Sequence, residues 1–293
     1  MTILKAYFTT ASGQIHYRFA LPSKPSTLPA LLFLHKSASS SASMTDLMNH
    51  FCSLGYACYG FDMPGFGSSF DPSPSDIRAI EEEGLVWYCK LYISILSSLG
   101  LWENTPGVHV LGHHSGAALA QQLAVLGPDI VKSVCLVGPT VVSKQERIVM
   151  REKFMVPFNT PEASGAHLMK TWEYLAKMGV VSGSTVSCTG KDLERWHREL
   201  LDHVRAWKGR LQIYGAVWNC DSEELFRGIE CPVLAVCARD DVLWEHMAHL
   251  QEHSKNKSKV ELGEVKGANF SVERDVEGLI ALWAPFLDRT NAS

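Results

Sequence analysis

Six short apolar runs recur along the chain, separated by stretches with a helical pattern. The runs occupy residues 30–35, 56–62, 108–112, 133–138, 232–238 and 259–265. Strands that are apolar on both faces belong to parallel sheets covered by helices on each side. The pattern therefore predicts an α/β fold with a mostly parallel, doubly wound sheet. The first twenty residues alternate more loosely around Gly13 and predict a hairpin at one edge.

Residues 139–228 lack this alternation of apolar runs and helical stretches. They have a helical pattern broken by prolines and glycines, and they hold four of the eight tryptophans. At about 150 residues per domain the chain would form two units, but the strands resume after the stretch. We therefore predict one core, residues 1–139 and 229–293, with a helical cap of residues 140–228 inserted into it. A cap so rich in aromatic residues favours a large apolar substrate.

The net charge and the cysteine spacing limit the kinds of molecule that this protein is expected to bind. Lys and Arg number 27 against 31 Asp and Glu, a net charge of −4, which excludes nucleic acid as the main partner. No apolar run approaches the length of a membrane span, and the first residues do not resemble a signal peptide, so a cytoplasmic location without membrane contact is expected. None of the eight cysteines forms a C-x-x-C pair, which argues against a metal site and for reduced thiols.

Four segments carry a family resemblance, in order along the chain. They are Leu-Phe-Leu-His at 32–35, Gly-Phe-Asp-Met-Pro-Gly-Phe-Gly-Ser at 60–68, Leu-Gly-His-His-Ser-Gly-Ala at 111–117, and the strand and loop at 231–241 that end in two aspartates. Together they resemble the α/β-hydrolase family. The resemblance implies that fold, a nucleophile on a sharp turn after a strand, an acid after a later strand and a histidine near the end.

The turn that should carry the nucleophile departs from the family pattern G-x-S-x-G. The two glycines are Gly112 and Gly116, and the residue midway between them is His114. Ser115 comes one place later, where its backbone N–H would serve the oxyanion hole. The central residue of this turn has a positive φ, which histidine tolerates better than most residues. We therefore assign His114, not Ser115, to the central position.

The other expected site residues also depart from the family. Asn269 occupies the position of the family histidine and cannot accept a proton near neutral pH. Asp241 is the expected acid, with Asp240 as the near alternative. The oxyanion loop reads His35-Lys36-Ser37, so Lys36 replaces a glycine and either points outward or reaches the cavity to bind an oxyanion. His35, Lys36, Ser37 and Ser115 are thus the candidates for oxyanion or substrate binding.

The expected catalytic set of His114, Asp241 and Asn269 has no hydroxyl to acylate, so ordinary serine esterase activity is not expected. An imidazole at the centre of the site can serve as a base or polarising group. By resemblance to non-hydrolytic tailoring enzymes of this fold, we predict a cofactor-independent cyclase or isomerase. Its substrate would be a hydrophobic, carbonyl-containing, polyketide-like intermediate.

Two alternatives stay open. One is an atypical hydrolase or C–C lyase in which His114 activates water or substrate. The other is a catalytically dead protein that binds a small molecule. The residues require no cofactor or metal, and whether the chain forms a homo-oligomer is left open.

Overall fold

The computed structural model describes residues 2–102, 107–182, 188–254 and 257–292, and an eight-stranded sheet lies at its centre. The strand order is β1-β2-β4-β3-β5-β6-β7-β8. The strands are β1 (Leu4–Thr9), β2 (Gln14–Ala20), β3 (Ala30–Leu34), β4 (Cys58–Phe61), β5 (Val108–His113), β6 (Val131–Val137), β7 (Val233–Ala238) and β8 (Val260–Val265). β3 to β8 pair in parallel, whereas β1 and β2 pair antiparallel. The predicted fold class is confirmed, and the predicted hairpin forms one edge of the sheet.

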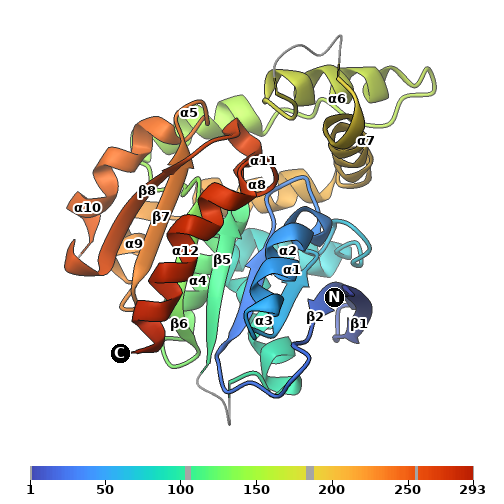
Figure 1. Ribbon diagram of the computed structural model, residues 1–293. Helices are drawn as coiled ribbons and strands as arrows, with labels where there is room; N and C mark the ends of the chain where they lie inside the picture. Colours follow the sequence, from blue (N-terminus) through green and yellow to red (C-terminus); the bar gives the residue numbers. More distant parts are fainter. Residues whose placement is uncertain (1, 103–106, 183–187, 255–256, 293) are drawn as a thin grey trace.

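Helices cover both faces of the sheet, which buries its apolar strands. α1 (Thr45–Ser53) and α12 (Val276–Asn291) pack on one face, and both cross in front of the sheet in Figure 1. On that face the ring of Trp283 packs edge-on against Phe33. α3 (Leu85–Ser98) and α4 (Ser115–Leu126) lie on the other face. A fully apolar strand such as β3 requires this double cover.

The helical pattern over residues 76–99 predicts one long helix, but the chain forms two. Gly84 has φ 62° and ψ −132° and separates α2 (Pro74–Glu83) from α3. That backbone conformation is accessible to glycine and ends the first helix. The sequence also predicts Ser75 as the N-cap of this helix, but a different serine takes that position.

The residue that caps α2 is Ser73. Its side chain accepts a hydrogen bond from the Asp76 N–H, and the Asp76 side chain accepts one from the Ser73 N–H. Pro74 then takes the first helical position, where its missing N–H and fixed φ suit a helix start. The capping pair and the proline together move the helix start two residues before the predicted one.

Five helices lie in the described residues between β6 and β7, and we call residues 138–232 the β6–β7 segment. They are α5 (Lys144–Phe154), α6 (Ala166–Lys177), α7 (Gly190–Arg205), α8 (Gly209–Asn219) and α9 (Ser222–Arg227). Figure 1 shows α6 and α7 at the top of the molecule, above the sheet. The indole rings of Trp172 and Trp196 stack at 3.9 Å between centroids and join these two helices. The predicted cap of residues 140–228 falls within this segment, and its status as a cap stays a prediction.

Short elements complete the chain. They are η1 (Ser41–Met44), η3 (Trp244–His249), α10 (Leu250–His253), η4 (Lys257–Lys259), η5 (Ala268–Phe270) and α11 (Ser271–Arg274). Among the helices of the described ranges, none has the length and apolar character needed to cross a bilayer. η1 follows β3, and η5 follows β8. Both lie in the loops after strand ends, where ligand sites of parallel sheets are built.

Candidate functional site

The turn between β5 and α4 has the shape of a nucleophile elbow, and His114 is its central residue. His114 has φ 48° and ψ −110°. Its carbonyl oxygen accepts a hydrogen bond of 2.8 Å from the Ala117 N–H, which starts α4. A Cβ on Gly116 would lie 2.6 Å from the carbonyl oxygen of His35, so only glycine lets the helix approach β3 this closely. The glycine spacing thus places the imidazole where the family carries its nucleophile.

Asp241 pairs with His114 across the end of the sheet. The His114 Nε2 and the Asp241 Oδ2 are 2.8 Å apart. Because a carboxylate only accepts, Nε2 carries the proton and Nδ1 keeps its lone pair. No hydrogen bond to Nδ1 comes from the described residues, and the His114 side chain is 17% exposed. The pair therefore presents an oriented base, Nδ1, with its tautomer set by Asp241.

The His114 ring is held in place from two sides. Gly138 follows β6 with φ 57°, and a Cβ there would lie 2.6 Å from the His114 Nε2. On another side the His113 ring contacts it edge-on, with centroids 4.6 Å apart. His113 is fully buried, and burial together with the neighbouring His114 lowers its pKa well below the ordinary value. His113 is thus a neutral packing residue beside the base.

The two alternatives for the acid separate clearly. The Asp240 Oδ1 accepts a 3.0 Å hydrogen bond from the Ala268 N–H, while Asp241 reaches the imidazole. The second oxygen of Asp241 accepts a 2.8 Å bond from the Leu243 N–H, which orients the carboxylate. Asn269 lines the cavity, and its Oδ1 accepts a bond of 3.2 Å from the Val242 N–H. Asn269 makes no hydrogen bond to His114 among the described residues, so Asp241 alone orients the imidazole.

Ser115 is tied to the loop after β3 by its side chain. Its Oγ accepts a 2.7 Å hydrogen bond from the Ser37 N–H. Its own N–H, at the start of α4, has no partner in the part of the chain that the structure describes. First-turn N–H groups and the helix dipole favour negative charge. Ser115 can therefore supply an oxyanion donor through its backbone while its hydroxyl holds Ser37.

Lys36 reaches the cavity lining, as in one of the two expected orientations, but a protein carboxylate pairs with its charge. Its Nζ forms an ion pair of 2.7 Å with Oε2 of Glu199 on α7. The two side chains are 4% and 0% exposed. Burial alone would raise the pKa of Glu199, but the charges of Lys36 and Arg198 lower it to about 2. The Lys36 charge is thus balanced within the protein.

His35, a predicted substrate-binding residue, lies outside the cavity lining. Its Nδ1 donates to the Lys36 carbonyl at 2.8 Å, and its Nε2 accepts from the Met63 N–H at 3.0 Å. Both ring nitrogens are therefore used by the backbone, and burial lowers the pKa of the ring. The physical reason is local, because both ring nitrogens of His35 are hydrogen-bonded to backbone groups and neither is available to a ligand.

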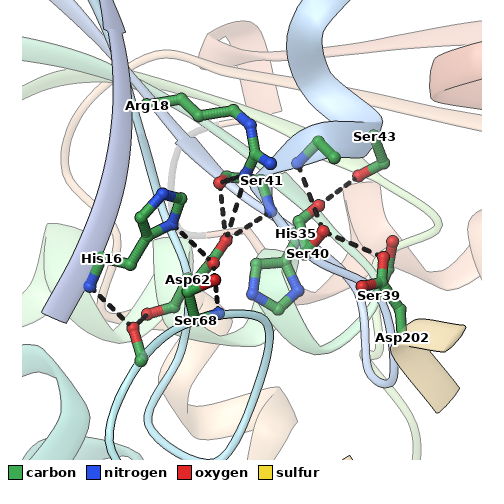
Figure 2. Close-up of polar contacts among 12 residues, drawn as sticks. His16, Arg18, His35, Ser39, Ser40, Ser41, Ser43, Asp62, Ser68 and Asp202 are labelled. Atoms are coloured by element: carbon green, nitrogen blue, oxygen red, sulfur yellow. Dashed lines mark hydrogen bonds and ion pairs between the residues drawn. The ribbon is translucent and has the colours of Figure 1, made fainter. Parts of the chain in front are cut away.

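Asp62 fastens the loops on this side of the site. It accepts hydrogen bonds from the Ser41 N–H at 2.7 Å and the Ser68 N–H at 3.0 Å, and it contacts His16 (Figure 2). Burial acts to raise the pKa of Asp62, but the hydrogen bonds from His16, Ser41 and Ser68 hold it well below the usual range. An ionised carboxylate thus joins two loops that lie far apart in the sequence.

The cavity at His114 measures about 60 Å³, several times the roughly 15 Å³ that one water needs. One wall comes from the core, through Lys36, Ser37, His114, Ser115 and Asn269. The facing wall comes from the β6–β7 segment, and four of its described residues are Phe, Tyr or Trp. The lining residues are Thr140, Phe154, Tyr174, Leu175, Met178, His203, Tyr214, Val217 and Trp218.

Two residues that the sequence does not reveal belong to this site, Glu199 and His203. Both are buried on α7 and stand four residues apart, on one face of a helix. A polar pair on the face that also carries Trp196 is the signal that could have found them. Within the described ranges, no cluster of three His, Cys, Asp or Glu side chains is placed to hold a metal ion.

The sequence matches the model of the alpha/beta hydrolase family over residues 31–278. Similar solved structures include a hydrolase from Pseudomonas aeruginosa, with 15% identity, a TM-score of 0.74, and coverage of 97% of this chain and 98% of that one. An epoxide hydrolase from Vigna radiata has 15% identity, a TM-score of 0.75 and 98% coverage of both chains. An N-formylmaleamic acid deformylase from Pseudomonas putida has 14% identity, a TM-score of 0.67, and coverage of 96% and 100%. Among curated proteins, none is significantly similar to this sequence.

The names of these structures correct one expectation. The sequence predicts a cyclase, isomerase or lyase in which ordinary serine esterase activity is not expected. The similar structures are instead named as hydrolases, which contradicts that expectation. The prediction rested on the missing serine hydroxyl and on Asn269 in place of the family histidine, and a base at position 114 that activates water needs neither.

Proposed function

The chain belongs to the alpha/beta hydrolase family, and on that premise we propose that it hydrolyses a small, largely apolar ester. The observation that carries the proposal is the 2.8 Å contact between His114 and Asp241 at the elbow. It orients a base at the position where the family holds its nucleophile. The apolar facing wall and the cavity volume of about 60 Å³ favour a short-chain substrate over a large one.

In the proposed reaction the lone pair on His114 Nδ1 takes a proton from a water molecule. The hydroxide oxygen attacks the carbonyl carbon, and the carbonyl oxygen becomes an oxyanion that accepts a hydrogen bond from the Ser115 N–H. Asp241 stabilises the imidazolium through the proton on Nε2. The ester C–O bond then breaks, and the imidazolium returns its proton from Nδ1 to the leaving oxygen. The products are one carboxylic acid and one alcohol.

The test compares two neighbouring substitutions. His114→Ala removes the base and should lower the turnover of short alkyl acetates to the uncatalysed rate, because no other group holds that position. Ser115→Ala keeps the backbone N–H and removes the hydroxyl, so its turnover should fall by less than about tenfold. Acid release followed at constant pH measures both, and thermal unfolding confirms that both variants fold.

The opposite result would identify a different nucleophile. If Ser115→Ala were inactive and His114→Ala active, the serine hydroxyl would be the attacking group. An acyl group on the intact protein, detected by mass spectrometry after rapid quenching, would lead to the same conclusion. The proposal requires that no acylated protein accumulates during turnover.

A further inference from the structure

His203 has one ring nitrogen committed to its own helix. Its Nδ1 lies 2.9 Å from the carbonyl oxygen of Glu199, one turn earlier on α7. A carbonyl oxygen only accepts hydrogen bonds, so Nδ1 must be the donor. The proton of the neutral ring is therefore on Nδ1, and Nε2 is left with a lone pair.

The surroundings keep this ring neutral. His203 is 4% exposed. Burial, together with the positive charge of Lys36, lowers the pKa of His203 to about 3. The ring therefore stays uncharged across the physiological range, and Nε2 is available only as an acceptor.

The remaining acceptor belongs to a residue that lines the cavity. His203 lies on the wall opposite His114, near the ring of Tyr174 at 6.1 Å between centroids. Among the described residues, none makes a hydrogen bond to Nε2. An acceptor without a protein partner on a cavity-lining residue gains from a bound group that donates a hydrogen bond to it.

We propose that His203 is a specificity-determining residue that selects substrates carrying a hydroxyl or N–H donor away from the reacting carbonyl. This inference rests on the proposed ester hydrolysis, and it specifies that the end of the ester away from the carbonyl carries a polar group. His114 handles the carbonyl, and the Nε2 of His203 accepts a hydrogen bond from the far end. An otherwise equal substrate ending in a methyl group would leave Nε2 unpaired and would bind less well.

A matched pair of esters tests the selection. The monoacetate of a terminal butanediol and pentyl acetate have the same number of heavy atoms and differ by one hydroxyl in place of one methyl. The readout is the ratio of kcat/KM for the two esters, hydroxyl over methyl. Shorter and longer pairs locate the chain length at which this ratio is highest in the unaltered protein.

Two substitutions distinguish the loss of the Nε2 acceptor from a general structural effect of replacing His203. His203→Phe keeps a planar ring without an acceptor, and His203→Gln offers a side-chain oxygen near the place of Nε2. Both remove the Nδ1 bond to Glu199 equally. We expect His203→Phe to lower the ratio by about tenfold or more, and His203→Gln to keep most of it. Equal ratios in the unaltered protein and His203→Phe would overturn the proposal, as would equal losses in both variants.

A binding measurement separates this inference from the proposed function. Trp218 lines the same cavity, so its fluorescence can report the binding of the two intact esters. If neither ester is hydrolysed, the proposed function fails, and the selection by His203 is still tested by the ratio of the two dissociation constants. That ratio should shift by about tenfold in His203→Phe and little in His203→Gln. A ratio unchanged in His203→Phe would overturn the selection independently of turnover.

Discussion

Lys36 and Glu199 form a buried ion pair between the loop after β3 and helix α7, with 2.7 Å between Nζ and Oε2. The Oε1 of Glu199 also accepts a 2.7 Å hydrogen bond from Ser39 on the same loop. Lys36 further lies over the ring of Phe270, 4.2 Å from its centroid. The pair is thus one of the points at which the β6–β7 segment is fastened to the core.

Removing one partner of this pair should destabilise the fold. In Lys36→Met the buried Glu199 carboxylate loses its closest cation and keeps the more distant Arg198, so the free energy of unfolding should fall by about 3 kcal/mol. Urea unfolding measures the loss. Lys170→Met is the matched control, because Lys170 pairs with Glu162 at the surface, where both side chains are largely exposed, and little change is expected there. A loss in Lys36→Met no larger than in this control would contradict the prediction.

Asp241→Asn should remove the base without removing the imidazole. An amide can donate to Nε2 and so favours the tautomer with the proton on Nδ1, where the lone pair is needed. We expect kcat to fall by about 10³- to 10⁴-fold with a KM close to the original. The control is Asp240→Asn, which keeps an oxygen to accept the bond from the Ala268 N–H. Similar losses in the two variants would show that the assignment of the acid is wrong.

Gly138→Ala should damage the site more than the fold. Its Cβ would lie 2.6 Å from the His114 Nε2, so the ring must move away from Asp241. We expect about a hundredfold loss of kcat/KM. Gly165→Ala is the control, because Gly165 also has a positive φ, 74°, but a Cβ there meets nothing within 4 Å. Both variants should lose about 1–2 kcal/mol of stability, and only Gly138→Ala should lose activity.

Asp202 makes stability depend on pH. Burial, and then the charge of Glu199, raise its pKa from 3.8 to about 7. Between these values the folded protein holds a proton that the unfolded chain has released. Its contribution is therefore fully present below pH 3.8 and is lost as the pH rises through about 7, at up to about 1.4 kcal/mol per pH unit.

Urea midpoints between about pH 4 and pH 8 check this sign. Asp202→Asn should flatten the decline in part, because Glu273, with a pKa also raised to about 7 by burial, acts in the same direction. Asp71→Asn, at an exposed carboxylate, is the control and should leave the slope unchanged. A variant Asp202→Asn with the full original slope would contradict the prediction.

The parts of the site that follow from short-range pattern could be predicted from the sequence. The spacing of Gly112 and Gly116 fixes His114 at the centre of a tight turn, since only neighbouring residues shape it. The position of Asp241 follows from its place after β7, because parallel strands end at the same edge of the sheet. The parallel sheet follows in the same way from the length and apolar character of its strands.

Contacts between distant segments could not be predicted in this way. Glu199 stands 163 residues after Lys36, and its burial depends on how α7 lies on the core. The cavity-lining place of His203 depends on the same packing. Asn269 lies in the predicted loop, but Asp241 contacts the imidazole directly, and Asn269 instead accepts a hydrogen bond from the Val242 N–H. These outcomes are decided by side-chain packing among the helices of the β6–β7 segment, which no local pattern describes.

The ion pair between Lys36 and Glu199 has a consequence for how a molecule enters the cavity. Moving α7 away from the loop after β3 would return an ammonium and a carboxylate to water. Hydration of the two ions would offset much of the attraction lost between them. A purely hydrocarbon contact of the same area has no such offset, because its separation only exposes apolar surface to water. The contact between α7 and the loop after β3, closed by this ion pair, therefore separates with less work than an apolar contact of the same area.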